Sequence, residues 1–333
     1  MSFFTFFIFI FFLLLSISSK KKKNIFEYIN SINTTWKANL NTIPSQFKNL
    51  LGVPLNYKSL PSIKSSLTSH KILNLTLPSK FDLRSEYSNC SSISKVYDQA
   101  NCGSCWAVAS ASTISDRICI NSNGLKTPLI SSTILTCCCL TCGSGCEGGY
   151  PLNAFKWWKT VGLPTGGDFN DTNTCSPYFL PPCDHGGING THGKCGEVVD
   201  TPKCSLKCID SYNKTYDEDK FYGKDVYSIS GEEDLMKEIY VNGSVTASFL
   251  VYEDFVGYKE GVYKHEIGEL LGAHAVRIVG WGEDDDGVKY WIVANSWNDE
   301  WGDKGMFKIL KGNNECDIEY MACSGMPVNY EKE

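Results

Sequence analysis

The stretch Gln99–Trp106 reads QANCGSCW and leads into a run with helical periodicity. From Cys105 to Ile118 the apolar residues recur at the three- and four-residue spacing of a helix. A cysteine attacks a carbonyl only as the thiolate, and a helix N-terminus together with a nearby imidazolium lowers the pKa of a thiol. We therefore predict that Cys105 is a nucleophile at the start of a helix. From composition alone, the alternative is that Cys105 is half of a disulfide.

The composition indicates an oxidising compartment. The 333 residues include 16 cysteines, which is many for a protein kept reduced in the cytosol. The chain is 42% hydrophobic and 20% charged, so it can bury a core. Its formal net charge of -6 provides no basic surface for nucleic acid, and we expect no nucleic-acid partner. Seven Asn-x-Ser/Thr glycosylation triplets agree with a secretory route, and they begin at Asn33, Asn74, Asn89, Asn170, Asn189, Asn213 and Asn242.

Composition also divides the chain into three segments. Residues 1–19 hold an apolar run that ends in small residues, and we expect a cleaved signal peptide with no membrane contact afterwards. An uncleaved anchor is the alternative, because the lysines at 20–23 follow the apolar run instead of preceding it. Residues 20–76 are polar and lack cysteine, which suits a propeptide. The composition changes near Leu77, so 77–333 is predicted to be the mature domain.

The chain resembles cathepsin B, a cysteine protease of the papain family, over residues 78–325. The resemblance rests on CGSCW at 102–106, which is the local motif of the papain-type nucleophile, on GCEGGYP at 145–151 and on WIVANSW at 291–297. It implies an α+β, papain-like two-lobed fold, with a helical N-terminal lobe, a β-barrel-like C-terminal lobe and an active-site cleft between them. Three strand-like runs agree with a β-rich C-terminal half, at 244–251, 275–280 and 290–294.

The resemblance implies catalytic roles for four residues. Cys105 is the nucleophile and His274 its general base, Asn295 orients the imidazole, and the Gln99 side-chain amide joins the Cys105 N–H as an oxyanion hole. His274 lies 169 residues after Cys105 (274 minus 105), more than the ~130 to 150 usual for papain relatives. A Cys-rich insertion at about 175–208 explains the excess. From the residues alone, His274 is equally a buried structural histidine and Asn295 a turn residue.

The resemblance also implies contacts with a substrate. Gly148 and Gly149 correspond to the backbone edge that pairs with a substrate strand, although glycines more commonly form tight turns. Trp297 belongs to the same substrate-binding set. Met321 stands where cathepsin B carries an acidic residue in its second specificity pocket. We therefore expect this pocket to prefer apolar or aromatic side chains, because an unpaired buried cation is costly.

A loop in cathepsin B carries two neighbouring histidines that hold the substrate's C-terminal carboxylate and give dipeptidyl-carboxypeptidase activity. In the matching stretch, 181–195, His185 corresponds to the first histidine and Gly186 replaces the second. Loss of one charge-assisted hydrogen bond, worth ~1.5 to 3 kcal/mol, should weaken that activity by roughly one to two orders of magnitude. We expect His185 to pair with Asp98 and close the loop over the cleft, and His192 is a partial substitute for the missing histidine.

The resemblance implies six disulfides, and it leaves Cys139, Cys316 and Cys323 unassigned. Because 137–139 reads CCC, the pairing within that run stays open. A zinc cluster between residues 137 and 146 is the alternative, which an oxidising compartment disfavours, so we expect no metal and no cofactor. The implied pairs are Cys90–Cys119, Cys102–Cys146, Cys137–Cys204, Cys138–Cys142, Cys175–Cys208 and Cys183–Cys195.

The implied function is a cysteine-type peptidase that acts through a thioester acyl-enzyme, mainly as an endopeptidase, and is made as a zymogen. Expected partners are peptide and protein substrates, the chain's own propeptide as inhibitor, and cystatin-like inhibitors. The expected location is the lysosome, an acidic vesicle or the extracellular space. A catalytically silent binding protein and a disulfide-rich structural protein are the alternatives, and the intact set of Gln99, Cys105, His274 and Asn295 argues against both.

Overall fold

The computed structural model describes residues 24–59, 75–186 and 190–328. The predicted signal peptide lies outside these ranges, as do parts of the predicted propeptide. Within the described ranges, no helix combines the length and apolar character of a membrane span.

Helix α6 (Cys105–Asn121) lies at the centre of the fold, and every side chain from Cys105 to Ile120 is buried. A helix buried on all sides must pair its charged residues, and α6 has two in succession. Asp116 accepts hydrogen bonds from the Arg277 guanidinium at 2.8 and 2.9 Å, and Arg117 donates to Glu238 at 2.7 Å. These pairs join α6 to the elements of the C-terminal half and fix the helix that begins at Cys105.

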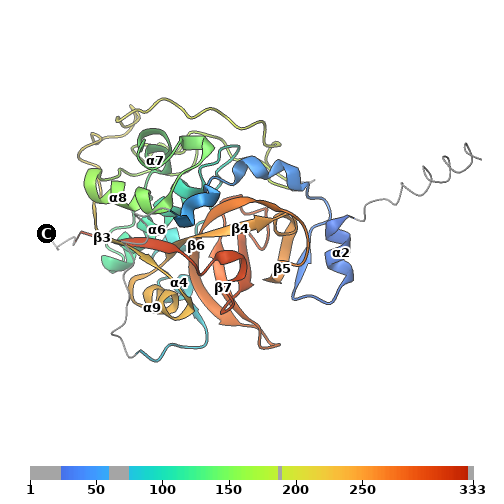
Figure 1. The fold of residues 1–333 in the computed structure, drawn as a ribbon. Coiled ribbons are helices and arrows are strands. Elements are labelled where there is room, and N and C mark those ends of the chain that lie inside the picture. The colour runs from blue at the N-terminus through green and yellow to red at the C-terminus, as the bar shows by residue number, and fades with distance from the viewer. Residues whose placement is uncertain (1–23, 60–74, 187–189, 329–333) are drawn as a thin grey trace, which may run out of the picture.

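Further helices pack on one side of α6 and form the helical lobe. Its apolar cluster joins α6 to α7 and α8, with Trp106, Phe155 and Trp158 among the buried side chains. Pro151 opens α8 at a position where its missing N–H costs no hydrogen bond. Figure 1 shows α7 and α8 together on the side of the molecule away from β7. The helices of this half are α4 (Leu83–Glu86), α5 (Ser91–Ser94), α7 (Ser132–Cys138), η4 (Gly145–Glu147) and α8 (Pro151–Val161).

A twisted sheet forms the second lobe, in the order β1-β5-β8-β7-β6-β4-β9-β3, with β2 paired to β6. All pairings are antiparallel except β5 with β8. Strand β6 (Leu270–Glu283) is longer than the predicted 275–280, because residues 270–274 extend the ladder with β4 and residues 281–283 extend the ladder with β7. The other elements are β2 (Phe81–Asp82), β3 (Gly223–Ile229), α9 (Glu232–Asn242), β4 (Val245–Tyr252), η5 (Phe255–Gly257), β5 (Tyr258–Tyr263), β7 (Lys289–Ala294), β8 (Met306–Leu310), η6 (Glu315–Asp317) and β9 (Ala322–Pro327).

The N-terminal segment 24–59 belongs to the same fold. Its strand β1 (Trp36–Ala38) pairs with β5, and the buried Trp36 indole N–H donates to the Lys264 carbonyl at 3.0 Å. Figure 1 shows α2 beside β5 at the edge of the sheet. The predicted α+β arrangement of a helical and a β-rich lobe is confirmed. The segment contains α2 (Ile25–Ser31), β1, and three short turns of 3-10 helix, η1 (Pro44–Gln46), η2 (Lys48–Leu50) and η3 (Leu55–Ser59).

Six disulfides occur among the described residues. Four are the pairs given above: Cys90–Cys119, Cys102–Cys146, Cys175–Cys208 and Cys183–Cys195. The predicted pairs Cys137–Cys204 and Cys138–Cys142 are wrong by one residue, because the structure joins Cys138 to Cys204 and Cys139 to Cys142.

The physical reason is the end of α7. Successive side chains on a helix point about 100° apart, so only one residue of the CCC run can face Cys204. Helix α7 ends at Cys138, and Cys139 starts a turn in which the Cys142 N–H donates to its carbonyl at 2.9 Å. That turn brings Cys139 and Cys142 together, and Cys137 remains a buried free thiol. Because Cys138, Cys139, Cys142 and Cys146 all form disulfides, the alternative zinc cluster is not formed.

Candidate active site

Cys105 and His274 come from opposite lobes, and the backbone N–H of Ala275, the residue after His274, is directed at the Cys105 thiol. Cys105 is the first residue of α6, and His274 lies in the buried part of β6, paired with Phe249 of β4. The His274 Nε2 and the Asn295 Oδ1 are 2.8 Å apart, so the amide oxygen fixes the ring. Nδ1 of His274 is buried and has no hydrogen-bond partner among the described residues. This nitrogen is therefore free to take part in proton transfer.

In this state both groups are held neutral. Burial raises the pKa of the Cys105 thiol to about 11, against smaller opposing contributions from backbone N–H groups that include those of Ala275 and Gly52. Burial lowers the pKa of His274 to about 4, and its hydrogen bond to Asn295 opposes this only in part. A thiol and a neutral imidazole make an inactive pair, because the nucleophile is the thiolate.

The cause of this burial is the N-terminal segment, which runs through the cleft at Leu50–Val53. The Gly52 N–H donates to the Cys105 sulfur at 3.3 Å, and the Gly52 carbonyl accepts from the Gly149 N–H at 2.8 Å. The Val53 N–H donates to the Ala273 carbonyl at 3.1 Å. A Cβ added to Gly52 would lie 1.8 Å from the Gly103 carbonyl oxygen, so only glycine fits there. The segment thus pairs with the cleft through its backbone.

The side-chain amide of Gln99 points toward the backbone of Leu50–Val53. Its Nε2 donates to the Leu50 carbonyl and to the Cys102 carbonyl, each at 2.8 Å. The Leu50 carbonyl oxygen therefore accepts from the amide that is predicted to stabilise the oxyanion during catalysis. The Ser296 hydroxyl donates to the Gln99 Oε1 at 2.7 Å and sets which end of the amide faces the cleft. Ser296 was missed from the sequence, although it lies in the ANSW string between Asn295 and Trp297.

Three of the predicted substrate contacts, Trp297, Gly148 and Gly149, also meet the N-terminal segment. Trp297 is fully buried, its ring centroid 4.8 Å from that of His274 and 4.8 Å from that of Phe47. Gly148 supports the edge from which Gly149 donates, since a Cβ on Gly148 would lie 2.9 Å from the Gly52 oxygen. Met321 packs against the apolar cluster that contains Val53 and the buried Tyr57.

The loop residue His185 is brought to the cleft by an ion pair. Its Nε2 lies 2.6 Å from the Asp98 Oδ1, and both side chains are at most 9% exposed. Burial acts to raise the pKa of Asp98, but the hydrogen bond and charge of His185, with the N–H of Ala100 and the amide of Asn298, hold it below the usual range. Asn298 also donates to the Cys183 carbonyl at 2.7 Å. The start of the loop is therefore anchored both to Asp98, which precedes α6, and to Asn298, which follows β7.

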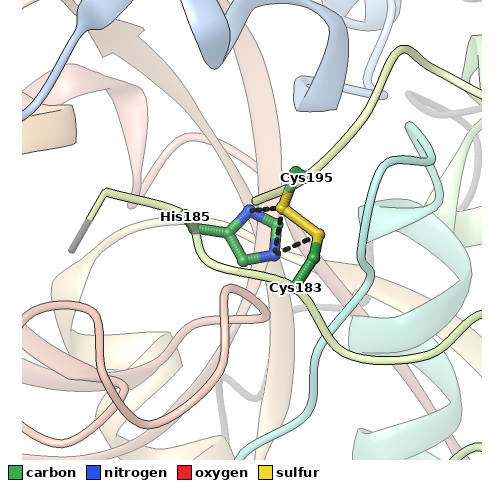
Figure 2. A group of neighbouring side chains, drawn as sticks. All are labelled: Cys183, His185 and Cys195. Atoms are coloured by element: carbon green, nitrogen blue, oxygen red, sulfur yellow. Dashed lines mark hydrogen bonds between the residues drawn. A yellow bond between two sulfur atoms is a disulfide. The ribbon is translucent and has the colours of Figure 1, made fainter. Parts of the chain in front are cut away.

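His185 also lies against the disulfide Cys183–Cys195, as Figure 2 shows. The three ligand atoms fall within 4.8 Å of one another, a spacing that suits a metal ion. Both sulfurs are joined to each other, however, and a metal binds thiolates, so the oxidised group does not fit a metal. It is instead a packed core for the loop, with the Cys195 sulfur 3.7 Å from the His185 Nδ1.

Gly186 follows His185 and faces the N-terminal segment. Its φ is +139°, a backbone conformation that only glycine adopts easily. Its carbonyl accepts a hydrogen bond from the Asn39 side chain at 3.4 Å, and a Cβ at Gly186 would lie 3.5 Å from Thr42. His192 lies further along the loop, where its charge acts on Glu300.

Comparison with known proteins identifies the class. The sequence profile described as "Papain family cysteine protease" matches residues 77–326. The chain therefore belongs to the papain family of cysteine proteases. Within that family it is a cathepsin B-like enzyme with the fold of a zymogen.

The relatives agree over most of the chain. The chain is 46% identical over 252 residues to the cathepsin B-like cysteine proteinase 1 of Ostertagia ostertagi, covering 76% of this chain and 74% of that protein. It is 43% identical over 314 residues to the cathepsin B-like cysteine proteinase 4 of Caenorhabditis elegans, covering 92% and 93%. Among solved structures, procathepsin B S9 from Trypanosoma congolense aligns with a TM-score of 0.77 and 36% identity, over 92% of this chain and 98% of that one.

Proposed function

We propose that this protein is the zymogen of a cysteine endopeptidase in which Cys105 is the nucleophile and His274 the general base. The observation that carries the proposal is a peptide backbone, Leu50–Val53, lying on the thiol with its carbonyl on the Gln99 amide. A site that holds one peptide backbone in this way suits another as substrate. Residues 20–76 are the propeptide and 77–333 the mature domain in this proposal.

Release of the N-terminal segment would start the chemistry. Water then reaches both groups, the pKa of the Cys105 thiol falls and that of His274 rises, and the proton moves from sulfur to the imidazole. Asn295 holds the charged ring through its amide oxygen. The helix N-terminus of α6 adds a favourable field for the thiolate.

Peptide cleavage then follows in two steps. The thiolate attacks the scissile carbonyl, and the Gln99 amide and the Cys105 N–H stabilise the oxyanion. His274 gives its proton to the leaving amine, which leaves a thioester on Cys105. Water, activated by the same imidazole, hydrolyses the thioester and restores the thiol.

The preference for endopeptidase action rests on Gly186, which offers no side chain to a substrate carboxylate. The His185–Asp98 pair holds the loop at the cleft, so dipeptidyl-carboxypeptidase activity is reduced and not abolished. The N-terminal segment is the natural inhibitor of this site, and cystatin-like inhibitors suit the same open cleft. We infer a location in lysosomes, acidic vesicles or outside the cell, which the disulfides among the described residues support because such bonds persist in oxidising compartments.

The test compares the activated protein with two variants that each lose one buried free thiol, Cys105→Ala and Cys137→Ala. At pH 5 we expect cleavage of a blocked peptide with Phe for the Met321 pocket, and at least ten-fold less release of dipeptides from a free-carboxylate peptide. Cys105→Ala should abolish both activities, and Cys137→Ala should keep them. Absence of cleavage of either peptide by the wild type would point to a catalytically silent binding protein.

A further inference from the structure

Asp317 and Tyr320 come shortly before Met321 in the chain, and a lysine of the N-terminal segment contacts both of them. The Lys58 ammonium forms an ion pair with the Asp317 carboxylate. The same ammonium lies 4.7 Å from the centre of the Tyr320 ring, within range of a cation–π interaction. The exposed fractions of the Lys58 and Asp317 side chains are 32% and 23%, so the pair is partly shielded from water. We call Asp317 and Tyr320 the rim site.

The residue next to Lys58 is a buried tyrosine. Tyr57 is 3% exposed and belongs to the cluster against which Met321 packs. The Lys58 ammonium lies 5.8 Å from the centre of the Tyr57 ring, so the tyrosine lies close to the rim site. Burial raises the pKa of Tyr57, and the charges of Asp317 and Tyr320 raise it further. A buried aromatic side chain of the Met321 cluster is thus followed by a basic side chain that contacts the rim site.

The rim site is built by the mature domain and does not depend on Lys58 for its shape. Asn314, Cys316 and Asp317 all have positive φ, from 49° to 64°, which turns the chain sharply. The buried Glu319 carboxylate accepts the Asn314 N–H at 3.0 Å and the Trp291 indole N–H at 2.9 Å, and so ties this turn to β7. The Asn314 side chain also donates to the Asp317 Oδ1 at 3.2 Å, which leaves Oδ2 for the cation.

We propose that Asp317 and Tyr320 form a specificity site for lysine or arginine in the substrate, one position further from the scissile bond than the residue in the Met321 pocket. The inference rests on the peptidase function proposed above. It also adds a charged neighbour to the Met321 pocket, for which the sequence predicts only a preference for apolar or aromatic side chains. The pocket itself lacks an acidic residue, but an acidic residue four positions earlier in the chain supplies negative charge at its entrance.

Two blocked reporter peptides test the preference, Lys-Phe-Gln and norleucine-Phe-Gln, which differ in charge and little in apolar length. We expect the activated enzyme to favour the lysine peptide by roughly three- to ten-fold in kcat/KM at low salt, the range of a partly exposed ion pair with an aromatic neighbour. In 1 M salt the ratio should fall, because screening weakens the pair. Asp317→Asn should bring the ratio close to one.

The matched control is Asp285→Asn, which removes the same charge from the exposed turn between β6 and β7 and should leave the ratio unchanged. A lysine preference that survives Asp317→Asn, or no preference in the wild type, would overturn the proposal.

Binding provides a readout that does not need catalysis. The Cys105→Ala protein, processed in trans by the wild type or a second protease, should bind the lysine peptide more tightly than the norleucine peptide by the same factor in fluorescence anisotropy. If the wild type hydrolyses neither peptide but lysine still binds preferentially through Asp317, the peptidase function fails and the rim site stands. Equal binding of the two peptides would refute the rim site alone.

Discussion

Gly52→Ala should open the cleft of the full-length protein. The new Cβ would lie 1.8 Å from the Gly103 carbonyl oxygen and 3.2 Å from the Gly103 Cα, and backbone atoms cannot turn aside as a flexible side chain can. A carbon and an oxygen need well over 3 Å, so the segment must move by more than 1 Å. A movement of that size breaks the hydrogen bonds that hold it: Gly52 N–H to Cys105, Gly149 N–H to Gly52, Val53 N–H to Ala273 and the Gln99 amide to Leu50.

These four bonds set the size of the effect. A net hydrogen bond contributes ~0.5 to 1.5 kcal/mol, so loss of the four should cost about 2 to 6 kcal/mol of the closed state. The population of the open state should therefore rise at least roughly 30-fold, and up to about 20,000-fold if each bond contributes fully. Labelling of a buried thiol proceeds through opening, so the alkylation rate of Cys105 should rise by the same factor. Peptide mass mapping separates Cys105 from the other free thiols, Cys137, Cys316 and Cys323.

The control for this experiment is Gly193→Ala in the loop, where an added Cβ meets no atom within 4 Å. This variant should label at the wild-type rate. If Gly52→Ala also labels Cys105 within two-fold of the wild-type rate, the backbone of Leu50–Val53 does not protect the thiol, and the reasoning about the closed state is wrong.

Three further predictions concern the loop, the disulfides and pH. Asp98→Asn removes the charge that pairs with His185, so dipeptide release should fall several-fold while cleavage of blocked peptides rises, as measured by kcat/KM on the two substrates. Cys138→Ser should lower the free energy of unfolding by about 2 to 4 kcal/mol in denaturant titrations, because it removes the disulfide to Cys204, 66 residues away. Cys137→Ser should change the free energy of unfolding little. Equal effects of the two substitutions would contradict the observed pairing. In the Cys105→Ala protein no thiol can supply the proton of the imidazolium. Burial lowers the pKa of His274 from 6.5 to about 4 and opening raises it again, so the open form of this variant takes up a proton, and closure should weaken as pH falls from about 6.5 to 4 and stay constant above. Hydrogen exchange of the N-terminal segment, corrected for intrinsic rates, should show this trend in the Cys105→Ala protein, and a flat profile would contradict it.

The sequence predicts a helix that starts at Cys105. The CGSCW motif marks the nucleophile, and the apolar residues that follow it recur at the spacing of a helix. The sequence also predicts three of the longer strands, since β-branched and aromatic runs between turn residues are strong signals. The CCC run is different, because spacing along the chain does not say where α7 ends or which thiol faces Cys204. The geometry of a helix end settles a pairing that residue counting leaves open.

The contacts of the N-terminal segment were the least predictable part of the site. Gly52 and its neighbours pair with the cleft through backbone groups, which every residue possesses, so no side-chain pattern marks them. Likewise, Ser296 acts on Gln99 across 197 positions of sequence, a distance at which a single serine carries no signal. Both features depend on three-dimensional contact between segments far apart in the chain.

The inhibiting segment is part of the chain that it inhibits, and this connection has a quantitative consequence. While the chain is intact, Leu50–Val53 and Cys105 belong to one molecule, so their contact does not depend on protein concentration. One cut between residue 59 and residue 75 turns the same contact into an ordinary encounter between two molecules. At micromolar protein concentration a segment of modest affinity then dissociates, so dilution contributes to activation. Enzyme that is released into a larger volume would therefore be more completely active than enzyme that stays concentrated.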